Sequence, residues 1–149
     1  MNYTEKGSRS YLFSIVLVAV LGGLLFGYDT AVISGAEKGL QAFFMGADDF
    51  IYTDSWHGIT SSSALLGCII GSALSGFFAS RFGRKLSLLM AGIMFFLSAL
   101  GSYYPEFLIF PYGTPSYSLL LTFNFYRVIG GVGVGLASAI CPMYIAEIA

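Results

Sequence analysis

The sequence predicts an all-α integral membrane protein with four transmembrane helices, and three observations lead to this fold class. Of the 149 residues, 56% are hydrophobic and only 10% are charged, whereas a soluble domain carries about 25% charged residues. Four apolar stretches each reach the length of about 20 residues that crosses the hydrocarbon core of a bilayer. Basic residues gather in two short segments beside these stretches, as they do on the cytoplasmic side of membrane proteins.

The four expected spans are residues 11–36, 56–80, 86–104 and 118–145. The first contains one charged residue, Asp29, and the fourth contains one, Arg127, whereas the second and third contain none. The second opens with Trp56 and His57, and tryptophan favours the membrane–water interface. We expect solvent around His57 at this loop edge, and we prefer that interpretation to a role in proton relay.

The loop charges predict the orientation of the chain. Lys6 and Arg9 precede the first span, and three basic residues stand in the segment 81–85 between the second and third spans. Residues 37–55 carry one lysine against four acidic residues, and residues 105–117 carry no lysine or arginine. Because positive charge marks cytoplasmic loops, we expect both termini and the segment 81–85 to be cytoplasmic.

Small residues recur at every fourth position in three of the spans, and such rows allow helix backbones to approach closely in lipid. The rows are Ala19, Gly23, Gly27, Ala31 and Gly35; Ser63, Gly67, Gly71, Ser75 and Ala79; and Gly131, Gly135 and Ala139, with Gly130 and Gly133 beside them. The glycine run at 130–135 is not expected to bind a nucleotide, because it lies inside an apolar span with no strand before it.

Asp29 and Arg127 are the best indication of function in the sequence. Asp29 lies seven residues before the outer end of its span and Arg127 nine residues after the outer end of its own, so their depths differ by only about 3 Å. Ionisable groups at membrane depth are costly, and they are usually paired and functional. We therefore expect a coupled pair whose protonation changes; the alternative is a static salt bridge between two helices.

Other classes of function find little support. No basic face suggests nucleic acid as a partner, and no nucleophile–base pair or metal cluster suggests an enzyme, a metal or another cofactor. Cys68 and Cys141 lie in apolar stretches, where they are expected to be small buried residues rather than a disulfide.

Four segments resemble the sugar porter family of the major facilitator superfamily, in the same order along the chain. Residues 22–35 look like its first helix, and residues 81–85, with Gly76 upstream, are similar to its loop between helices two and three. Residues 127–135 resemble its fourth helix, and residues 142–149 resemble the cytoplasmic end of that helix.

The resemblance implies a role for several residues. Asp29 matches the proton-coupling acid, Arg127 its partner, and Phe26 an aromatic residue at the sugar site. Passive facilitators of the family generally have a neutral residue at the position of Asp29, so this carboxylate favours symport. A cytoplasmic charge network that latches the outward-open state is implied for Gly76, Arg81, Gly83, Arg84, Lys85 and Glu147.

The family has twelve helices, so the resemblance implies that residues 1–149 form the N-terminal part of a transporter N-domain, the first third of the whole fold. The expected function is proton-coupled symport of a monosaccharide, a pentose or hexose, by alternating access in the bacterial inner membrane. The expected partners are the sugar, the proton, the lipid bilayer and the missing C-terminal part, without which we expect no activity. An uncoupled sugar facilitator and a small structural or assembly protein of the membrane are the alternatives.

Overall fold

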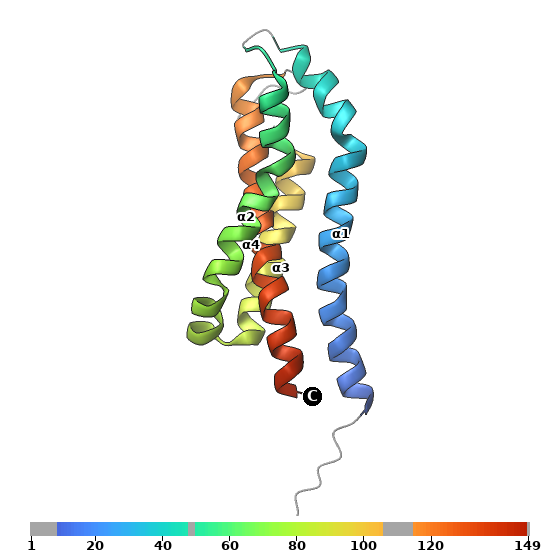
Figure 1. Ribbon diagram of the computed structural model, residues 1–149, viewed down its shortest axis with the longest axis vertical. Helices are drawn as coiled ribbons and strands as arrows, with labels where there is room; N and C mark the ends of the chain where they lie inside the picture. Colours follow the sequence, from blue (N-terminus) through green and yellow to red (C-terminus); the bar gives the residue numbers. More distant parts are fainter. Residues whose placement is uncertain (1–8, 48–49, 106–114, 149) are drawn as a thin grey trace, which may run out of the picture.

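The computed structural model describes residues 9–47, 50–105 and 115–148, which form four helices (Figure 1). They are α1 (Arg9–Met45), α2 (Asp54–Phe82), α3 (Arg84–Tyr103) and α4 (Tyr117–Ile148). Within α1 the side chains of several residues before Gly27, Phe26 among them, lie outside the described part. The connection between α1 and α2 lies at one end of the bundle, and the connection between α2 and α3 lies at the other (Figure 1).

The spans expected at 11–36, 56–80 and 118–145 each lie inside one helix, and the span expected at 86–104 ends one residue after α3. Among the described residues, three helices are long and apolar enough to cross a membrane by length and composition, namely Asp54–Phe82, Arg84–Tyr103 and Tyr117–Glu147. The span expected at 11–36 lies within α1, where part of the side chains is undescribed, so that span stays a prediction.

The first helix is longer than the sequence indicated. It continues past Ala36 to Met45, which corrects the loop that we expected from residue 37 onward. Leu40 and Phe44 are one turn apart and therefore share a face of the helix. They pack at the end of the bundle with Tyr52, Leu119, Leu120, Phe50 and Trp56.

A single residue, Gly83, joins α2 to α3. Its φ of +80° lies in the region that glycine adopts without a steric cost, so a glycine permits this one-residue reversal between two long helices. The backbone N–H of Ser87 and its hydroxyl both donate to the carbonyl of Gly83. The Gly83 carbonyl thus accepts the first backbone hydrogen bond of α3 and a second one from the Ser87 side chain.

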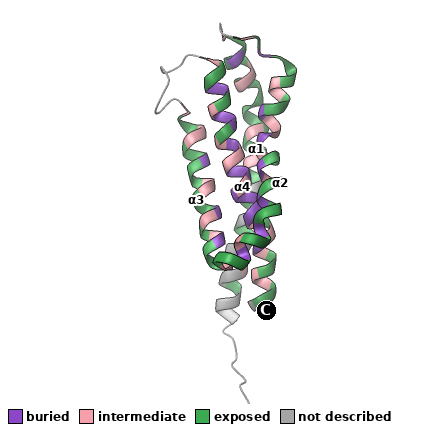
Figure 2. Cartoon of the chain, turned by 90° about the vertical axis from the view of Figure 1, so that its left-hand side faces the viewer, coloured by how far each residue is buried: buried purple, intermediate pink, exposed green. Residues whose placement is uncertain are grey.

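The fourth helix is the centre of the bundle. It packs along α2 and α3, and α1 leans chiefly on α4. Figure 2 shows buried residues along α4 and on the side of α2 toward it, and exposed residues on the outer faces. Those outer faces carry large apolar side chains such as Ile69, Phe96 and Phe125, which suits a surface in contact with lipid tails.

Two of the three small-residue rows pack as expected. Every member of the α2 row is buried, and its glycines lie against the backbone of α4, Gly67 at Gly131 and Gly71 at Val132. In the α1 row, Gly27 and Gly35 have open space where a side chain would stand. At these two positions the row therefore has no partner among the described helices.

Candidate functional site

Asp29 and Arg127 meet where α1 leans on α4. The Nη2 atom of Arg127 lies 3.5 Å from Oδ2 of Asp29, which is an ion pair but longer than the 2.7–2.9 Å of a tight charge-assisted hydrogen bond. The Arg127 side chain is 8% exposed and that of Asp29 is 35% exposed. The structure thus brings together the two intramembrane charges, with the base anchored in the bundle and the acid more accessible.

Glycines on two sides of α4 place Arg127 inside the bundle. A Cβ at Gly131 would collide with the backbone carbonyl of Ala64, and one at Gly135 with that of Cys68, so these glycines allow close approach to α2. On the other side, a Cβ at Gly133 would stand 2.7 Å from the carbonyl oxygen of Ala91 on α3. The helix that carries Arg127 is consequently enclosed by α2 and α3, and these three glycine positions have no room for a larger side chain.

Asn124 adds a buried polar group one turn before Arg127, and our sequence analysis missed it. Its amide nitrogen donates to Oγ1 of Thr60 on α2 over 3.3 Å, and both side chains are buried. Its Oδ1 atom has no hydrogen-bond partner, and neither has Nε of Arg127. The available signal was an amide inside an apolar stretch at spacing three from a charged residue.

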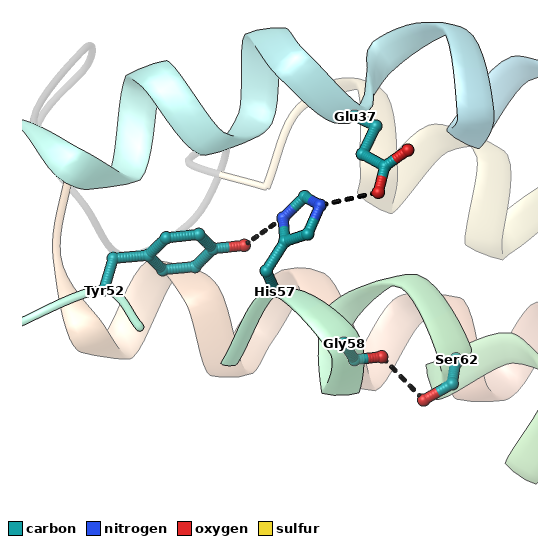
Figure 3. Close-up of polar contacts among 5 residues, drawn as sticks. All are labelled: Glu37, Tyr52, His57, Gly58 and Ser62. Carbon is teal, nitrogen blue, oxygen red and sulfur yellow. Dashed lines mark hydrogen bonds and ion pairs between the residues drawn. The ribbon is translucent and has the colours of Figure 1, made fainter. Parts of the chain in front are cut away.

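A second polar cluster joins the helices at the α1–α2 end of the bundle (Figure 3). The Nε2 atom of His57 lies 2.8 Å from Oε1 of Glu37 on α1, and Nδ1 lies 3.1 Å from the hydroxyl of Tyr52. A neutral imidazole with its proton on Nε2 satisfies both contacts, since it donates to Glu37 and accepts from Tyr52. The expectation of solvent around His57 is wrong, because its side chain is only 16% exposed.

Tyr52 is the buried member of this cluster. Burial raises the pKa of Tyr52 above 10.0, a hydrogen bond with the Thr60 side chain opposes that rise, and the charge of Glu37 adds to it. The phenol therefore keeps its proton at neutral pH and remains able to donate to His57. Below it in α2, the Ser62 hydroxyl donates to the Gly58 carbonyl within the same helix (Figure 3).

The expected charge network lies at the opposite end, around the reversal between α2 and α3. Arg84 forms an ion pair with Glu147 near the end of α4, and so links α3 to α4. Arg81 and Lys85 are exposed and form no ion pair with any residue that the structure describes. Gly76 is exposed and has open space beside it. Of the six residues in this network, Arg84 and Glu147 form the ion pair and Gly83 forms the turn. The structure shows no corresponding role for the other three.

The remaining candidate is the aromatic residue at the implied sugar site. Phe26 lies in α1, but its side chain is outside the described residues, so its role stays a prediction. Among the described residues no group of three or more His, Cys, Asp or Glu side chains could hold a metal ion. Cys68 and Cys141 are both free thiols.

Comparison with known proteins gives the family. The sequence model of the sugar (and other) transporter family matches residues 15–149. The D-xylose-proton symporter of Escherichia coli K12 is 51% identical over 150 residues, which cover 95% of this chain and 30% of that protein. The glucose facilitated diffusion protein of Zymomonas mobilis is 38% identical over 148 residues, which cover 98% of this chain and 30% of that protein.

The fold agrees with the sequence comparison. A solved structure of the proton:xylose symporter XylE of the major facilitator superfamily, bound to 6-bromo-6-deoxy-D-glucose, matches with a TM-score of 0.86 and 48% identity. The match covers 96% of this chain and 32% of that one, so the chain spans about a third of its relatives' length. These relatives are transporters, not enzymes, as the sequence predicted. The chain therefore belongs to the sugar transporter family of the major facilitator superfamily.

Proposed function

We propose that this chain is the first part of a symporter that couples the entry of a monosaccharide, D-xylose or a similar sugar, to protons. One observation carries the proposal: the paired intramembrane charges Asp29 and Arg127, in a chain of the sugar transporter family. Charged groups inside a membrane are expensive and usually serve transport or proton transfer. The relative named as a D-xylose-proton symporter supports the choice of sugar and ion.

In this mechanism Asp29 takes up the proton. Protonation removes the negative charge, so the attraction between α1 and α4 at this point weakens. Arg127 stays held in the bundle by its burial, whereas Asp29 is the more exposed partner. Weakening of this contact permits one half of the transporter to rock against the other, which is alternating access.

The sugar lies near the membrane midplane, where transporters of this type place their substrates. Phe26, three residues before Asp29, contributes an aromatic face to it. Four helices cannot surround such a cavity and also alternate its access, so the C-terminal part of the transporter completes the site. The open row at Gly27 and Gly35 offers α1 a face on which further helices can pack closely.

The orientation follows from the loop charges. Both termini and the α2–α3 reversal are cytoplasmic in the bacterial inner membrane, since the basic residues gather there. The cluster of His57 and Glu37 then faces outward. At the cytoplasmic end, the Arg84–Glu147 pair latches the outward-open state, with Arg81, Lys85 and the glycines of the same motif as its remaining members.

The proposal is tested in the complete transporter, reconstituted into vesicles, by sugar accumulation against a gradient and by sugar exchange. Asp29→Asn mimics the permanently protonated acid, so uphill accumulation is expected to fall to the equilibrium distribution while exchange persists. Undiminished accumulation in this variant would remove Asp29 from the mechanism.

Two further results separate the alternatives. An uncoupled facilitator, the activity named for the Zymomonas mobilis relative, equilibrates sugar in the wild type without accumulation. A static salt bridge predicts that Asp29→Asn and Arg127→Leu both lose folding and that the double variant recovers folding and proton-driven uptake. A coding frame that stops after Ala149 would favour an accessory protein, whereas eight further hydrophobic spans would support the transporter.

A further inference from the structure

Two buried polar atoms near the candidate site have no hydrogen-bond partner, and they are chemically complementary. Oδ1 of Asn124 is an acceptor, and Nε–H of Arg127 is a donor. Their residues are 9% and 7% exposed, so bulk water does not satisfy either atom. Unpaired buried polar atoms are rare and costly in native proteins, and two of them on adjacent turns of one helix require an explanation.

The positions of the two residues allow a direct contact. Residues at spacing three lie on the same face of a helix, and helical side chains lean toward the N-terminus. The long side chain of Arg127 can therefore reach along α4 to Asn124. The amide itself is oriented from the α2 side, because its nitrogen donates to Thr60, and this leaves the carbonyl oxygen as its free end.

We propose that Asn124 is a positioning residue that accepts a hydrogen bond from Arg127 when Asp29 becomes protonated. This inference rests on the proton-coupled function proposed above. The proton comes from water on the outer side and binds the Asp29 carboxylate, which becomes a neutral carboxylic acid; no other bond forms or breaks. Arg127 then loses its counter-charge and turns toward Asn124, so the Nε–H of the buried guanidinium gains an acceptor.

This change of partner by Arg127 involves only Asp29, Arg127 and Asn124. The other titratable side chains of the described residues near the pair are Tyr28 on α1, which is exposed, and Cys68 on α2, which lies beside Gly135. Tyr126 faces away, since its ring lies against Gly101 of α3. None of these three side chains forms an ion pair with Arg127.

The proposal has a defined effect on the pH dependence of transport. Asn124 stabilises the state in which Asp29 is protonated and leaves the deprotonated state, where Arg127 pairs with Asp29, unaffected. Removal of the acceptor therefore makes protonation less favourable. Half-maximal proton-driven uptake should then require a more acidic outer solution.

The experiment compares Asn124→Leu with Thr60→Val in the complete transporter. Asn124→Leu removes the acceptor, and the midpoint of the pH dependence of uptake is expected to fall by about one pH unit, given the usual strength of a hydrogen bond to a charged group. Thr60→Val removes the hydroxyl that contacts Asn124 and Tyr52 but keeps the acceptor oxygen of Asn124, so it should leave the midpoint unchanged. Thermal unfolding of both variants checks the fold, and Asn124→Val repeats the test with a smaller side chain should the leucine variant fail to fold.

The outcomes separate this inference from the proposed function. Equal losses of melting temperature in the two variants with an unchanged pH midpoint would mean that Asn124 only fixes α4 against α2, and would overturn the proposal. A wild-type transporter whose uptake does not depend on protons would overturn the proposed function itself. The two failures are distinct, because only the second appears before any substitution at Asn124.

Discussion

The contact between α2 and α4 should be intolerant of a single methyl group at Gly71. A Cβ at this position would stand 2.9 Å from both the carbonyl carbon and the Cα of Val132, and still closer to the carbonyl oxygen. Carbon atoms pack best at about 3.5–4.0 Å, so the two backbones would have to separate by roughly 0.6–1.1 Å. Both neighbours are backbone atoms of a helix and cannot rotate away as a side chain would.

The magnitude follows from two opposing terms. Overpacking of a tight contact costs about 1–3 kcal/mol, and replacement of a helical glycine by alanine regains about 0.5–1 kcal/mol of backbone entropy. We expect Gly71→Ala to destabilise the complete transporter by about 1–2 kcal/mol. Gly92→Ala on α3 is the matched control, because it has nothing within 4 Å of the added methyl group and should be neutral or slightly stabilising.

The assay is thermal unfolding of both variants in detergent beside the wild type. A lower melting temperature for Gly71→Ala and an unchanged or higher one for Gly92→Ala is the expected result. Equal melting temperatures for the two variants would refute the reasoning, since they would show that α2 and α4 are not in backbone contact. The same argument predicts that Gly131→Leu is more damaging than Gly131→Ala, and that neither is tolerated fully, because the methyl group already meets the Ala64 carbonyl.

The remaining predictions concern the cytoplasmic latch and the orientation. Arg84→Gln breaks the half-exposed ion pair with Glu147. Because such pairs contribute only about 0–1 kcal/mol, the population of the outward-open state should fall by no more than about fivefold. Distances between spin labels measure this population. Lys38→Gln, an exposed lysine on α1 outside the network, is the control for Arg84→Gln and should have a smaller effect; equal effects would exclude a specific pair. With the two native cysteines replaced by serine, Thr53→Cys should react with an impermeant thiol reagent from outside intact cells, whereas Ser80→Cys should not. The reverse labelling would overturn the orientation.

The sequence predicted much of the fold because its strongest signals are local. Apolar stretches of membrane length need no partner to be recognised, and three of the four expected spans lie in helices that meet this criterion. The spacing of small residues predicted helix faces that allow close packing, since spacing four places residues on one face, and the faces of α2 and α4 meet in this way. The meeting of Asp29 with Arg127 was also accessible, because depth in a membrane can be counted along a helix.

Other features depend on which helix faces which, and the sequence could not provide them. The small-residue row of α1 has the same spacing as that of α2, yet Gly27 and Gly35 face no described helix. Spacing defines a face of a helix but not its partner. The extension of α1 to Met45 arises from packing of Phe44 against Leu119 and Leu120, which are distant in the sequence.

The polar residues also divide into those that the sequence located and those that only the tertiary structure brought together. Composition and spacing by themselves determined a membrane protein with one acid and one base at matching depth, and the resemblance of four segments implied the sugar porter family. Only the tertiary structure placed His57 between Glu37 and Tyr52 and Asn124 against Thr60. Each of these contacts joins two elements, so it depends on the rotation of one helix against another. That rotation is fixed by the whole packed bundle, in particular by the glycines that let α4 approach α2 and α3, and no local pattern contains it.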